Sequence, residues 1–220
     1  MGPMWLKSVS SPRQWGTVTL NSRNAGPLVR SRPRSLFVTM QEAELAWWKR
    51  YLDHPTARQR MWALYGARYY DFFWRDMGNA ENTVEIGAGP VPVMEIMSCS
   101  RGTAVDTLGD AYRAAGLAKW PYVPIGDVPD GYADTLLLLN VLDHTDDPQE
   151  LVRDGYRVLR VGGRALVFVH LNQGDDKHRR VSESEPGGWL GSAGFLLERW
   201  AIKPPTVYDP SAYMAVVVKP

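Results

Sequence analysis

The sequence has a single cysteine and no long apolar run, and each absence excludes a class of protein. Cys99 cannot form a disulfide within the chain, so the chain is not a disulfide-stabilised secreted scaffold. The aliphatic run Leu136 to Leu139 is far shorter than the roughly 18 residues that a membrane-spanning helix needs. No cleavable signal peptide is visible. We therefore expect a cytoplasmic protein with no membrane partner.

Acidic side chains are missing from the first 40 residues, which contain six Lys or Arg and four prolines. This composition predicts a disordered basic tail over residues 1–39. Two alternatives stay open, namely that Met40 is the true start, or that the tail is an arginine-rich targeting or anion-binding arm. The remaining chain has 19 bases against 24 acids, a net charge of −5. A basic patch suited to nucleic acid is absent from it.

With 220 residues, of which 45% are hydrophobic, the chain can build an ordinary core. Helical patterns follow Gln41 and run from about Thr56 to Met77, with a break at His54-Pro55. The aromatic residues of the second pattern recur three or four positions apart, so they pack on a sheet or cover a ligand pocket. We assign residues 40–78 to N-terminal helices on the substrate side and residues 79–220 to the main domain.

A short strand and a glycine loop meet in residues 83–92, Thr-Val-Glu-Ile-Gly-Ala-Gly-Pro-Val-Pro. Glycine accepts positive φ and has no Cβ to obstruct a ligand, so Gly87 and Gly89 suit a binding loop. A helix is predicted from Val93 to Ser98, which makes this the first βα unit of a nucleotide-binding sheet. Asp106 ends the next strand about 20 residues later, where a carboxylate can accept hydrogen bonds from ribose hydroxyls.

Strands and helices continue to alternate to the end of the chain, which predicts an α/β fold with right-handed crossovers. The expected architecture is a Rossmann-like, seven-stranded sheet with helices on both faces, an antiparallel last strand and an N-terminal helical extension. The later strands are expected at Tyr122–Ile125, Asp134–Val141, Ala165–Val169, Phe195–Ile202 and Tyr213–Val218. The later helices are expected at Asp110–Leu117, from Asp147-Pro148 to Gly162-Gly163, and at Gly187–Gly194.

Two further stretches carry a resemblance to a known family. They are residues 138–148, Leu-Leu-Asn-Val-Leu-Asp-His-Thr-Asp-Asp-Pro, and residues 156–167, Tyr-Arg-Val-Leu-Arg-Val-Gly-Gly-Arg-Ala-Leu-Val. Together with the glycine loop they resemble the class I S-adenosylmethionine-dependent methyltransferases, more narrowly the small-molecule branch called methyltransferase type 11, over about residues 82–170. The resemblance implies transfer of a methyl group from S-adenosylmethionine to a small-molecule acceptor by in-line displacement. No Asn-Pro-Pro-Tyr-like tetrapeptide follows the fourth strand, which argues against a nucleic-acid substrate.

The resemblance also implies the cofactor-binding residues. The methionine and ribose part of the cofactor would lie against Glu85, Gly87, Ala88 and Gly89. The ribose hydroxyls would bind Asp106, and the adenine would lie by Thr107 and Leu108 and donate to Asp127. The methionine moiety and the reactive methyl would lie beside Asn140 and Val141. The family commonly has a small residue where this chain has Val91, between Pro90 and Pro92, which raises the question whether the loop still holds its cofactor.

Methyl transfer to a hydroxyl or amine gains from a general base, and histidine is the usual one. His144 and His170 follow predicted strands and are the candidates, and the alternative for each is a structural histidine. A metal could be suggested by Asp143, His144, Asp146 and Asp147. We expect no metal site, because Asp146 and Asp147 are better explained as caps of the following helix. The charged stretch Asp175 to Glu185 is read as a solvated loop or, alternatively, a substrate lid.

Two other functions remain open. The first is a catalytically weak methyltransferase-like domain that acts as a binding or interaction protein. The second is a nicotinamide dehydrogenase, which is less favoured because Pro92 stands where its third glycine would fall. The sequence indicates neither the acceptor nor the oligomeric state.

Overall fold

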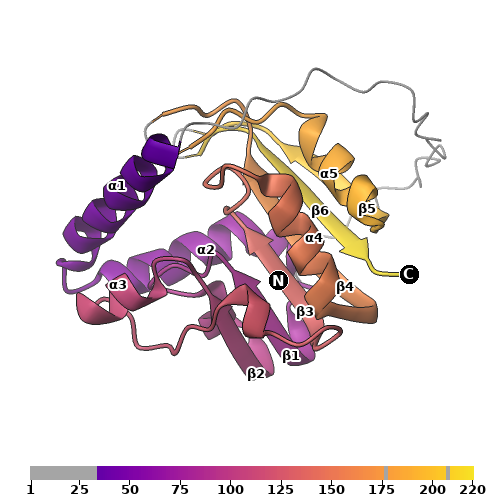
Figure 1. Ribbon diagram of the computed structural model, residues 1–220, viewed down its shortest axis with the longest axis horizontal. Helices are drawn as coiled ribbons and strands as arrows, with labels where there is room; N and C mark the ends of the chain where they lie inside the picture. The colour runs from indigo at the N-terminus through magenta and orange to yellow at the C-terminus, as the bar shows by residue number, and fades with distance from the viewer. Residues whose placement is uncertain (1–33, 176–177, 207–208) are drawn as a thin grey trace, which may run out of the picture. The chain divides into compact units, whose positions relative to one another are not determined.

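The computed structural model describes residues 34–175, 178–206 and 209–220 and contains a six-stranded sheet with helices on both faces (Figure 1). The strand order is β2-β1-β3-β4-β6-β5. The strands are β1 (Gly78–Ile86), β2 (Ser98–Val105), β3 (Ala133–Leu139), β4 (Leu159–His170), β5 (Leu196–Lys203) and β6 (Ala212–Val218). The α-helices are α1 (Arg34–Leu52), α2 (Ala57–Phe73), α3 (Gly109–Ala114), α4 (Pro148–Val158) and α5 (Glu185–Ala193). Two 3₁₀ turns, η1 (Val93–Ile96) and η2 (Ile125–Asp127), complete the described elements.

The first four strands pair in parallel, and β6 pairs antiparallel with both β4 and β5. The predicted α/β class and the antiparallel last strand are thus confirmed, with six described strands against the seven expected. The predicted strand Tyr122–Ile125 contributes a single bridge, between Ala104 and Tyr122. Pro121 and Pro124 lack the N–H groups that a longer ladder would use, and the chain then turns into η2.

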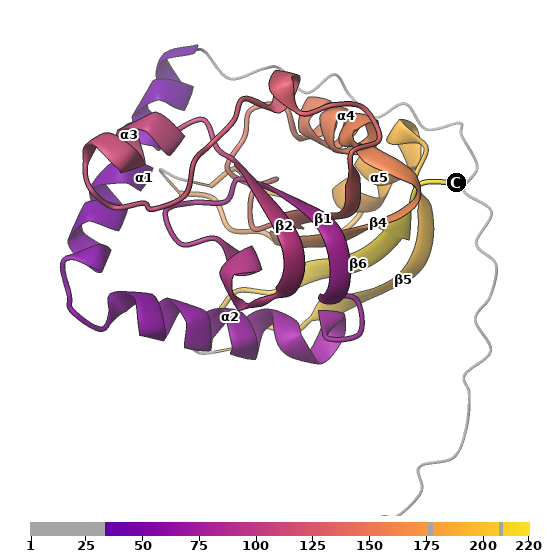
Figure 2. The same ribbon diagram turned by 90° about the horizontal axis from the view of Figure 1, so that it is seen from below.

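Alternate residues of β3 enter two separate core layers. Leu136 and Leu138 pack in the cluster that includes α4 and α5, while Leu137 and Leu139 pack in the cluster that includes α2. Figure 2 shows the same arrangement, with α2 along one face of the sheet and α4 and α5 on the other. Burial on both faces explains why the strand reads as a continuous apolar run.

The N-terminal helices begin earlier than predicted. Helix α1 starts at Arg34, so residues 34–39 are helical and do not belong to a disordered tail, while the tail prediction for residues 1–33 lies outside the described residues. The predicted break at His54-Pro55 separates α1 from α2. The buried side chains of α2 recur every four positions, as an aromatic-rich face packed on the sheet requires: Met61, Tyr65, Tyr69 and Phe73.

Two helix predictions were wrong at their ends. The helix expected after the glycine loop is only the four-residue turn η1, because β2 begins at Ser98. Helix α4 starts as predicted, with the Asp147 side chain accepting from the Glu150 N–H at 2.8 Å, but it ends at Val158. The pair Gly162-Gly163 lies inside β4, where the Gly162 N–H donates to the Lys219 carbonyl at 2.8 Å. The glycines therefore serve the sheet rather than the helix end.

None of the described helices combines the length and the apolar character that crossing a bilayer requires.

Candidate active site

A cavity of about 740 Å³ lies at the carboxyl ends of the parallel strands, and α1 and α2 contribute to its wall. Its volume falls within the range of roughly 300 to 1,000 Å³ that is typical of small-molecule sites. We name two groups of its lining residues after the roles that the sequence led us to expect. The cofactor end comprises Gly87, Ala88, Gly89, Asp106, Thr107 and Leu108, and the acceptor end comprises His144, His170, Gln173, His178 and Asp209.

The glycine loop needs its glycines for two separate reasons. Gly87 and Gly89 have φ values of 71° and 57°, in the left-handed region that most side chains avoid. A Cβ on Gly87 would lie 2.3 Å from Val141 Cγ2, and one on Gly89 would lie 3.4 Å from Trp48 Cζ2. Gly87 therefore lets the backbone pack directly against Val141, and Gly89 does the same against Trp48 at ordinary contact distance, so the loop holds its place in the cavity wall.

Asp106 organises the cofactor end. Its Oδ2 accepts from the Gly89 N–H at 2.9 Å and its Oδ1 from the Leu108 N–H at 2.8 Å. Burial raises the pKa of this carboxyl, and the two N–H donors act in the opposite direction. A carboxylate has about four lone-pair positions, so both oxygens can still accept from the hydroxyls of a bound ribose.

Glu85 lines the cavity but also fixes the turn after the loop. Its two carboxyl oxygens accept from the N–H groups of Val93 and Met94, each at 2.9 Å. Burial raises the pKa of Glu85 to about 8, against the effect of these two donors. The side chain thus accepts from the first N–H groups of η1, which have no partner within a helical turn.

Val91 turns away from the cavity. Its side chain is fully buried in the core layer under α2, and it is not among the residues that line the cavity. The Tyr65 hydroxyl donates to the Val91 carbonyl at 2.9 Å, which ties the loop to α2. The departure from the small residue of the family therefore leaves the described cavity open.

The adenine side agrees with the sequence only in part. Thr107 and Leu108 line the cavity, and the Thr107 hydroxyl accepts from Gln41 of α1 at 3.1 Å. Asp127 is exposed and does not line the cavity, because η2 carries it outward. The lining residue nearest to it in the chain is Ile125. The structure therefore gives no support to the predicted adenine contact of Asp127.

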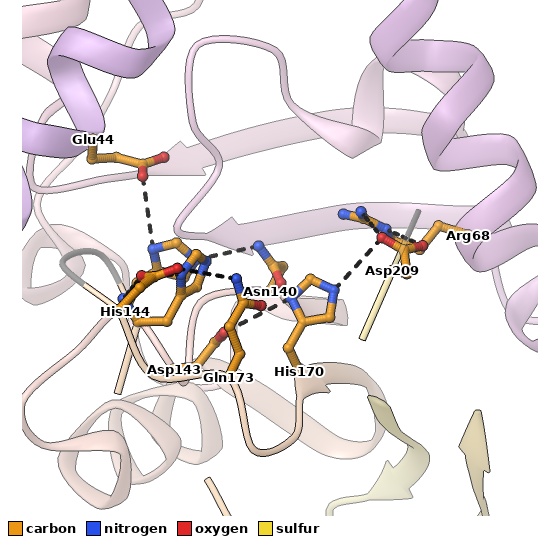
Figure 3. Close-up of polar contacts among 10 residues, drawn as sticks. Glu44, Arg68, Asn140, Asp143, His144, His170, Gln173 and Asp209 are labelled. Atoms are coloured by element: carbon orange, nitrogen blue, oxygen red, sulfur yellow. Dashed lines mark hydrogen bonds and ion pairs between the residues drawn. The ribbon is translucent and has the colours of Figure 1, made fainter. Parts of the chain in front are cut away.

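Asn140 and Val141 lie at the boundary between the two ends. Asn140 has a φ of 61°, a value that asparagine tolerates better than most residues, and its N–H donates to the Phe168 carbonyl at 2.8 Å. Its Nδ2 lies 3.3 Å from His144 Nε2. The other ring nitrogen of His144, Nδ1, lies 3.8 Å from a carboxylate oxygen of Glu44 (Figure 3). This set places an imidazole and an amide on the cavity wall.

His170 lies between two carboxylates, as Figure 3 shows. Its Nδ1 is 3.9 Å from Asp143 Oδ2, and its Nε2 is 3.9 Å from Asp209 Oδ1. Burial, followed by the nearby Arg68 charge, lowers the pKa of His170 to about 3, and burial raises the pKa of Asp143 to about 7. His170 is therefore neutral at pH 7, but an imidazole with so low a pKa is a weak general base.

Sequence reasoning missed most of the acceptor end. Arg68 forms two hydrogen bonds to Asp209, although 141 positions separate them in the chain. The prediction of a solvated loop from Asp175 to Glu185 is wrong in part, because His178 and Val181 are buried. Two backbone hydrogen bonds fold this stretch onto the strand ends, from the Asn172 N–H to Val181 at 2.8 Å and from the Arg179 N–H to Asp143 at 2.7 Å. No local sequence pattern predicts contacts between residues that lie so far apart in the chain.

Comparisons with known proteins agree with this geometry. Residues 84–167 match the family model Methyltransf_11, described as a methyltransferase domain. A search of the curated proteins found no match.

Three solved structures illustrate the structural likeness. The Burkholderia thailandensis 1,6-didemethyltoxoflavin-N1-methyltransferase, solved with S-adenosylhomocysteine, has 16% identity and a TM-score of 0.57 over 92% of this chain and 98% of its own. The N-methyltransferase NodS from Bradyrhizobium japonicum WM9, also solved with S-adenosylhomocysteine, has 18% identity and a TM-score of 0.57, and the match covers 84% of this chain and 98% of NodS. The [4+2]-cyclase SpnF has 17% identity and a TM-score of 0.51, and the match covers 74% of this chain and 81% of SpnF. At these identities the likeness establishes the fold.

The fold is that of the class I S-adenosylmethionine-dependent methyltransferases. The stretch that matches the type 11 methyltransferase model, residues 84–167, begins within β1 and ends within β4, in agreement with the resemblance found in the sequence. The prediction of S-adenosylmethionine as the cofactor of this domain is likewise confirmed.

Proposed function

We propose that the chain transfers a methyl group from S-adenosylmethionine to a small-molecule acceptor held at the acceptor end of the cavity. The observation that carries the proposal is the continuity of one cavity of about 740 Å³ from the glycine loop to the histidines after β3 and β4. Known small-molecule sites have similar volumes, whereas a macromolecular substrate needs an extended open surface. One neighbour with bound S-adenosylhomocysteine, the 1,6-didemethyltoxoflavin-N1-methyltransferase, also holds 1,6-didemethyltoxoflavin, a small compound, which supports this class of acceptor.

The residues present suit the cofactor. The loop of Gly87 to Gly89 presents backbone to the cavity, Asp106 can accept from ribose hydroxyls, and Asn140 with Val141 would face the methionine part. When bound, S-adenosylmethionine supplies an electrophilic methyl group on a positively charged sulfur. These contacts are proposals for this chain.

The acceptor would lie against aromatic walls. Trp47, Trp48, Tyr65 and Tyr69 all line the cavity from α1 and α2. Such rings bury a flat or apolar body well, and positioning alone can supply roughly 7 to 11 kcal/mol of a bimolecular barrier. Of the two histidines named as candidate bases, His144 is the better placed, because the low pKa of His170 leaves it a poor proton acceptor.

The test is calorimetric binding of S-adenosylhomocysteine to the full chain, with Asp106→Ala beside it. The wild type should bind, and the variant should bind at least about tenfold more weakly, because it loses the carboxylate that accepts from ribose and from the loop. A matched control is Asp110→Ala, an acid that also lines the cavity but makes its described contact to Arg113. Equal affinities for wild type and Asp106→Ala would contradict the assignment.

The same measurement separates the other functions. A chain that binds no S-adenosylhomocysteine up to millimolar concentration would favour a methyltransferase-like interaction protein. Binding of S-adenosylhomocysteine, together with transfer of a labelled methyl group from S-adenosylmethionine to one of a set of small candidate acceptors, would support the enzyme. Cytoplasmic location and the assignment of residues 79–220 to the catalytic domain belong to this proposal and are tested by localisation of the tagged chain and by limited proteolysis.

A further inference from the structure

Three buried side chains from separate segments converge beside the acceptor end. Asp143 follows β3, His170 ends β4, and His178 lies between β4 and α5. One potential ligand atom from each lies within 4.8 Å of the others. We propose that Asp143, His170 and His178 bind a divalent transition-metal ion of the Zn²⁺ type, with an open coordination position that faces the cavity.

Buried polar atoms without partners favour a bound ion at this point. Asp143 is 0% exposed and His170 5% exposed. Among the described residues, none forms a hydrogen bond with either carboxyl oxygen of Asp143 or with either ring nitrogen of His170. Buried polar groups in folded proteins are nearly always paired, and each orphan costs about 1 to 3 kcal/mol. A metal ion would satisfy both side chains at once.

A carboxylate lies behind each imidazole. Metal-binding histidines commonly donate their other ring N–H to a carboxylate, which fixes the tautomer and the ring orientation. His178 Nδ1 is 2.6 Å from Asp175 Oδ1, which leaves Nε2 as its ligand atom. His170 Nε2 faces Asp209 at 3.9 Å, which leaves Nδ1, and this atom faces Asp143. His178 thus has a hydrogen-bonded outer partner, and His170 has a carboxylate nearby that lies beyond hydrogen-bond distance.

One separation between two of the ligand atoms is close to that of a tetrahedral site. Zinc binds nitrogen and oxygen at about 2.0 to 2.2 Å, so tetrahedral ligand atoms lie about 3.4 Å apart. The observed separation of Asp143 Oδ2 and His170 Nδ1 is 3.9 Å. None of the three ligand-atom separations exceeds 4.8 Å, so a bound ion would draw the side chains closer together than they stand here.

The donor set selects the kind of metal. Two imidazole nitrogens and one carboxylate oxygen suit Zn²⁺, Fe²⁺ or Co²⁺, whereas Mg²⁺ and Ca²⁺ prefer oxygen ligands alone. The expectation of no metal site considered Asp143 only with its neighbours in the chain, and His170 and His178 come from elsewhere. The competing arrangement is a metal-free cluster in which Asp143, once protonated, donates to His170.

The position gives the ion a function that rests on the function proposed above. His170 and His178 line the cavity, whereas Asp143 lies behind them. An acceptor hydroxyl bound to the open position would release its proton to solvent more readily, because a metal ion lowers the pKa of a bound oxygen. This would replace the strong general base that His170 cannot provide.

The test uses the full chain, free of any affinity tag and of bound metal. Zn²⁺ is titrated by calorimetry, and Co²⁺ by its visible d–d absorption. We expect one equivalent of each to bind. Loss of a ligand in Asp143→Asn or His178→Ala should weaken Zn²⁺ binding by at least about 100-fold, and Asp175→Asn by roughly 10- to 100-fold through its effect on His178. The matched control is His54→Gln, which should bind as the wild type does, because His54 contacts Thr56 and lies outside the cavity.

A wild type that shows no cobalt absorption and no zinc heat at millimolar metal would overturn the proposal, as would ligand variants that bind zinc unchanged. X-ray absorption at the zinc edge of the wild type does not depend on whether the variants fold. Two imidazoles bound directly to the zinc would support the site, and any other number of bound imidazoles would contradict it. Binding of S-adenosylhomocysteine is followed in parallel. If the chain binds S-adenosylhomocysteine but no metal, only the metal site is overturned. If it binds metal but no S-adenosylhomocysteine, only the proposed function is overturned.

Discussion

The two ends of the cavity are built in different ways. The cofactor end depends on backbone: positive φ at two glycines and carboxylates that accept from N–H groups of the same βα connection. The acceptor end depends on side chains from distant segments, such as the pair Arg68 and Asp209. Local backbone geometry follows from short motifs, whereas distant side-chain contacts depend on the whole fold. Substitutions that alter the backbone conformation should therefore have the larger effect at the cofactor end, and substitutions that remove a charge should have the larger effect at the acceptor end.

The largest expected effect is at the acceptor end. Asp209→Asn leaves the Arg68 guanidinium, whose side chain is only 13% exposed, without its carboxylate. Breaking a buried pair from one side costs about 3 to 5 kcal/mol of unfolding free energy. Denaturant titration should show this loss, while the variant that remains folded binds S-adenosylhomocysteine unchanged. A matched control is Glu198→Gln in the exposed pair with Arg164, which should cost less than about 1 kcal/mol. A loss of cofactor affinity in Asp209→Asn would show that the two ends are not independent.

The corresponding change at the cofactor end is Gly87→Ala. The new Cβ meets Val141 at 2.3 Å and must also adopt a φ of +71°. Gly116→Ala is the matched control, because its φ is +70° and nothing lies within 4 Å of the added atom. The control should lose about 1 to 2 kcal/mol from the backbone alone, and Gly87→Ala a further 1 to 3 kcal/mol together with most of its affinity for S-adenosylhomocysteine. Equal losses in the two variants would show that Val141 yields without cost.

A pH dependence should follow from Glu85. Because burial raises its pKa in the folded state to about 8, the folded chain holds a proton that the unfolded chain has released. Its contribution to stability is therefore complete at low pH and declines as the pH rises towards about 8, by at most about 1.4 kcal/mol per pH unit. Glu85→Gln, which does not titrate, should show a shallower decline in unfolding free energy between about pH 5 and pH 8. Parallel curves for the two proteins would rule Glu85 out as the cause.

The smallest expected effect concerns the link between α2 and the glycine loop. Tyr65→Phe removes the hydroxyl that donates to the Val91 carbonyl and should cost about 1 kcal/mol. Tyr70→Phe is the control, since Tyr70 is 60% exposed and should show almost no change. If Tyr65→Phe also weakens cofactor binding, a helix contributes to the end that otherwise depends on backbone, and the contrast between the two ends is smaller than described.

Much of the fold could be predicted because its signals are local. The glycines of the loop, Asp106 after β2 and the apolar run of β3 each sit within one or two elements, and all were placed correctly. The third predicted strand failed because Pro121 and Pro124 limit its pairing, a competition that apolar spacing does not reveal. At the acceptor end, His178 is not among the residues predicted from the sequence, because its contact with Asp175 and those of its loop with the end of β4 form only when the loop folds back.

Helix α1 forms a wall common to both ends. Gln41 and Glu44 lie one turn apart on it, the first 3.1 Å from Thr107 and the second 3.8 Å from His144. A ligand at one end that restrained this helix would also change the affinity for a ligand at the other end. Thermodynamic reciprocity would make the change the same factor in both directions. The affinity for each ligand, measured with and without the other, therefore reports whether α1 joins the two ends.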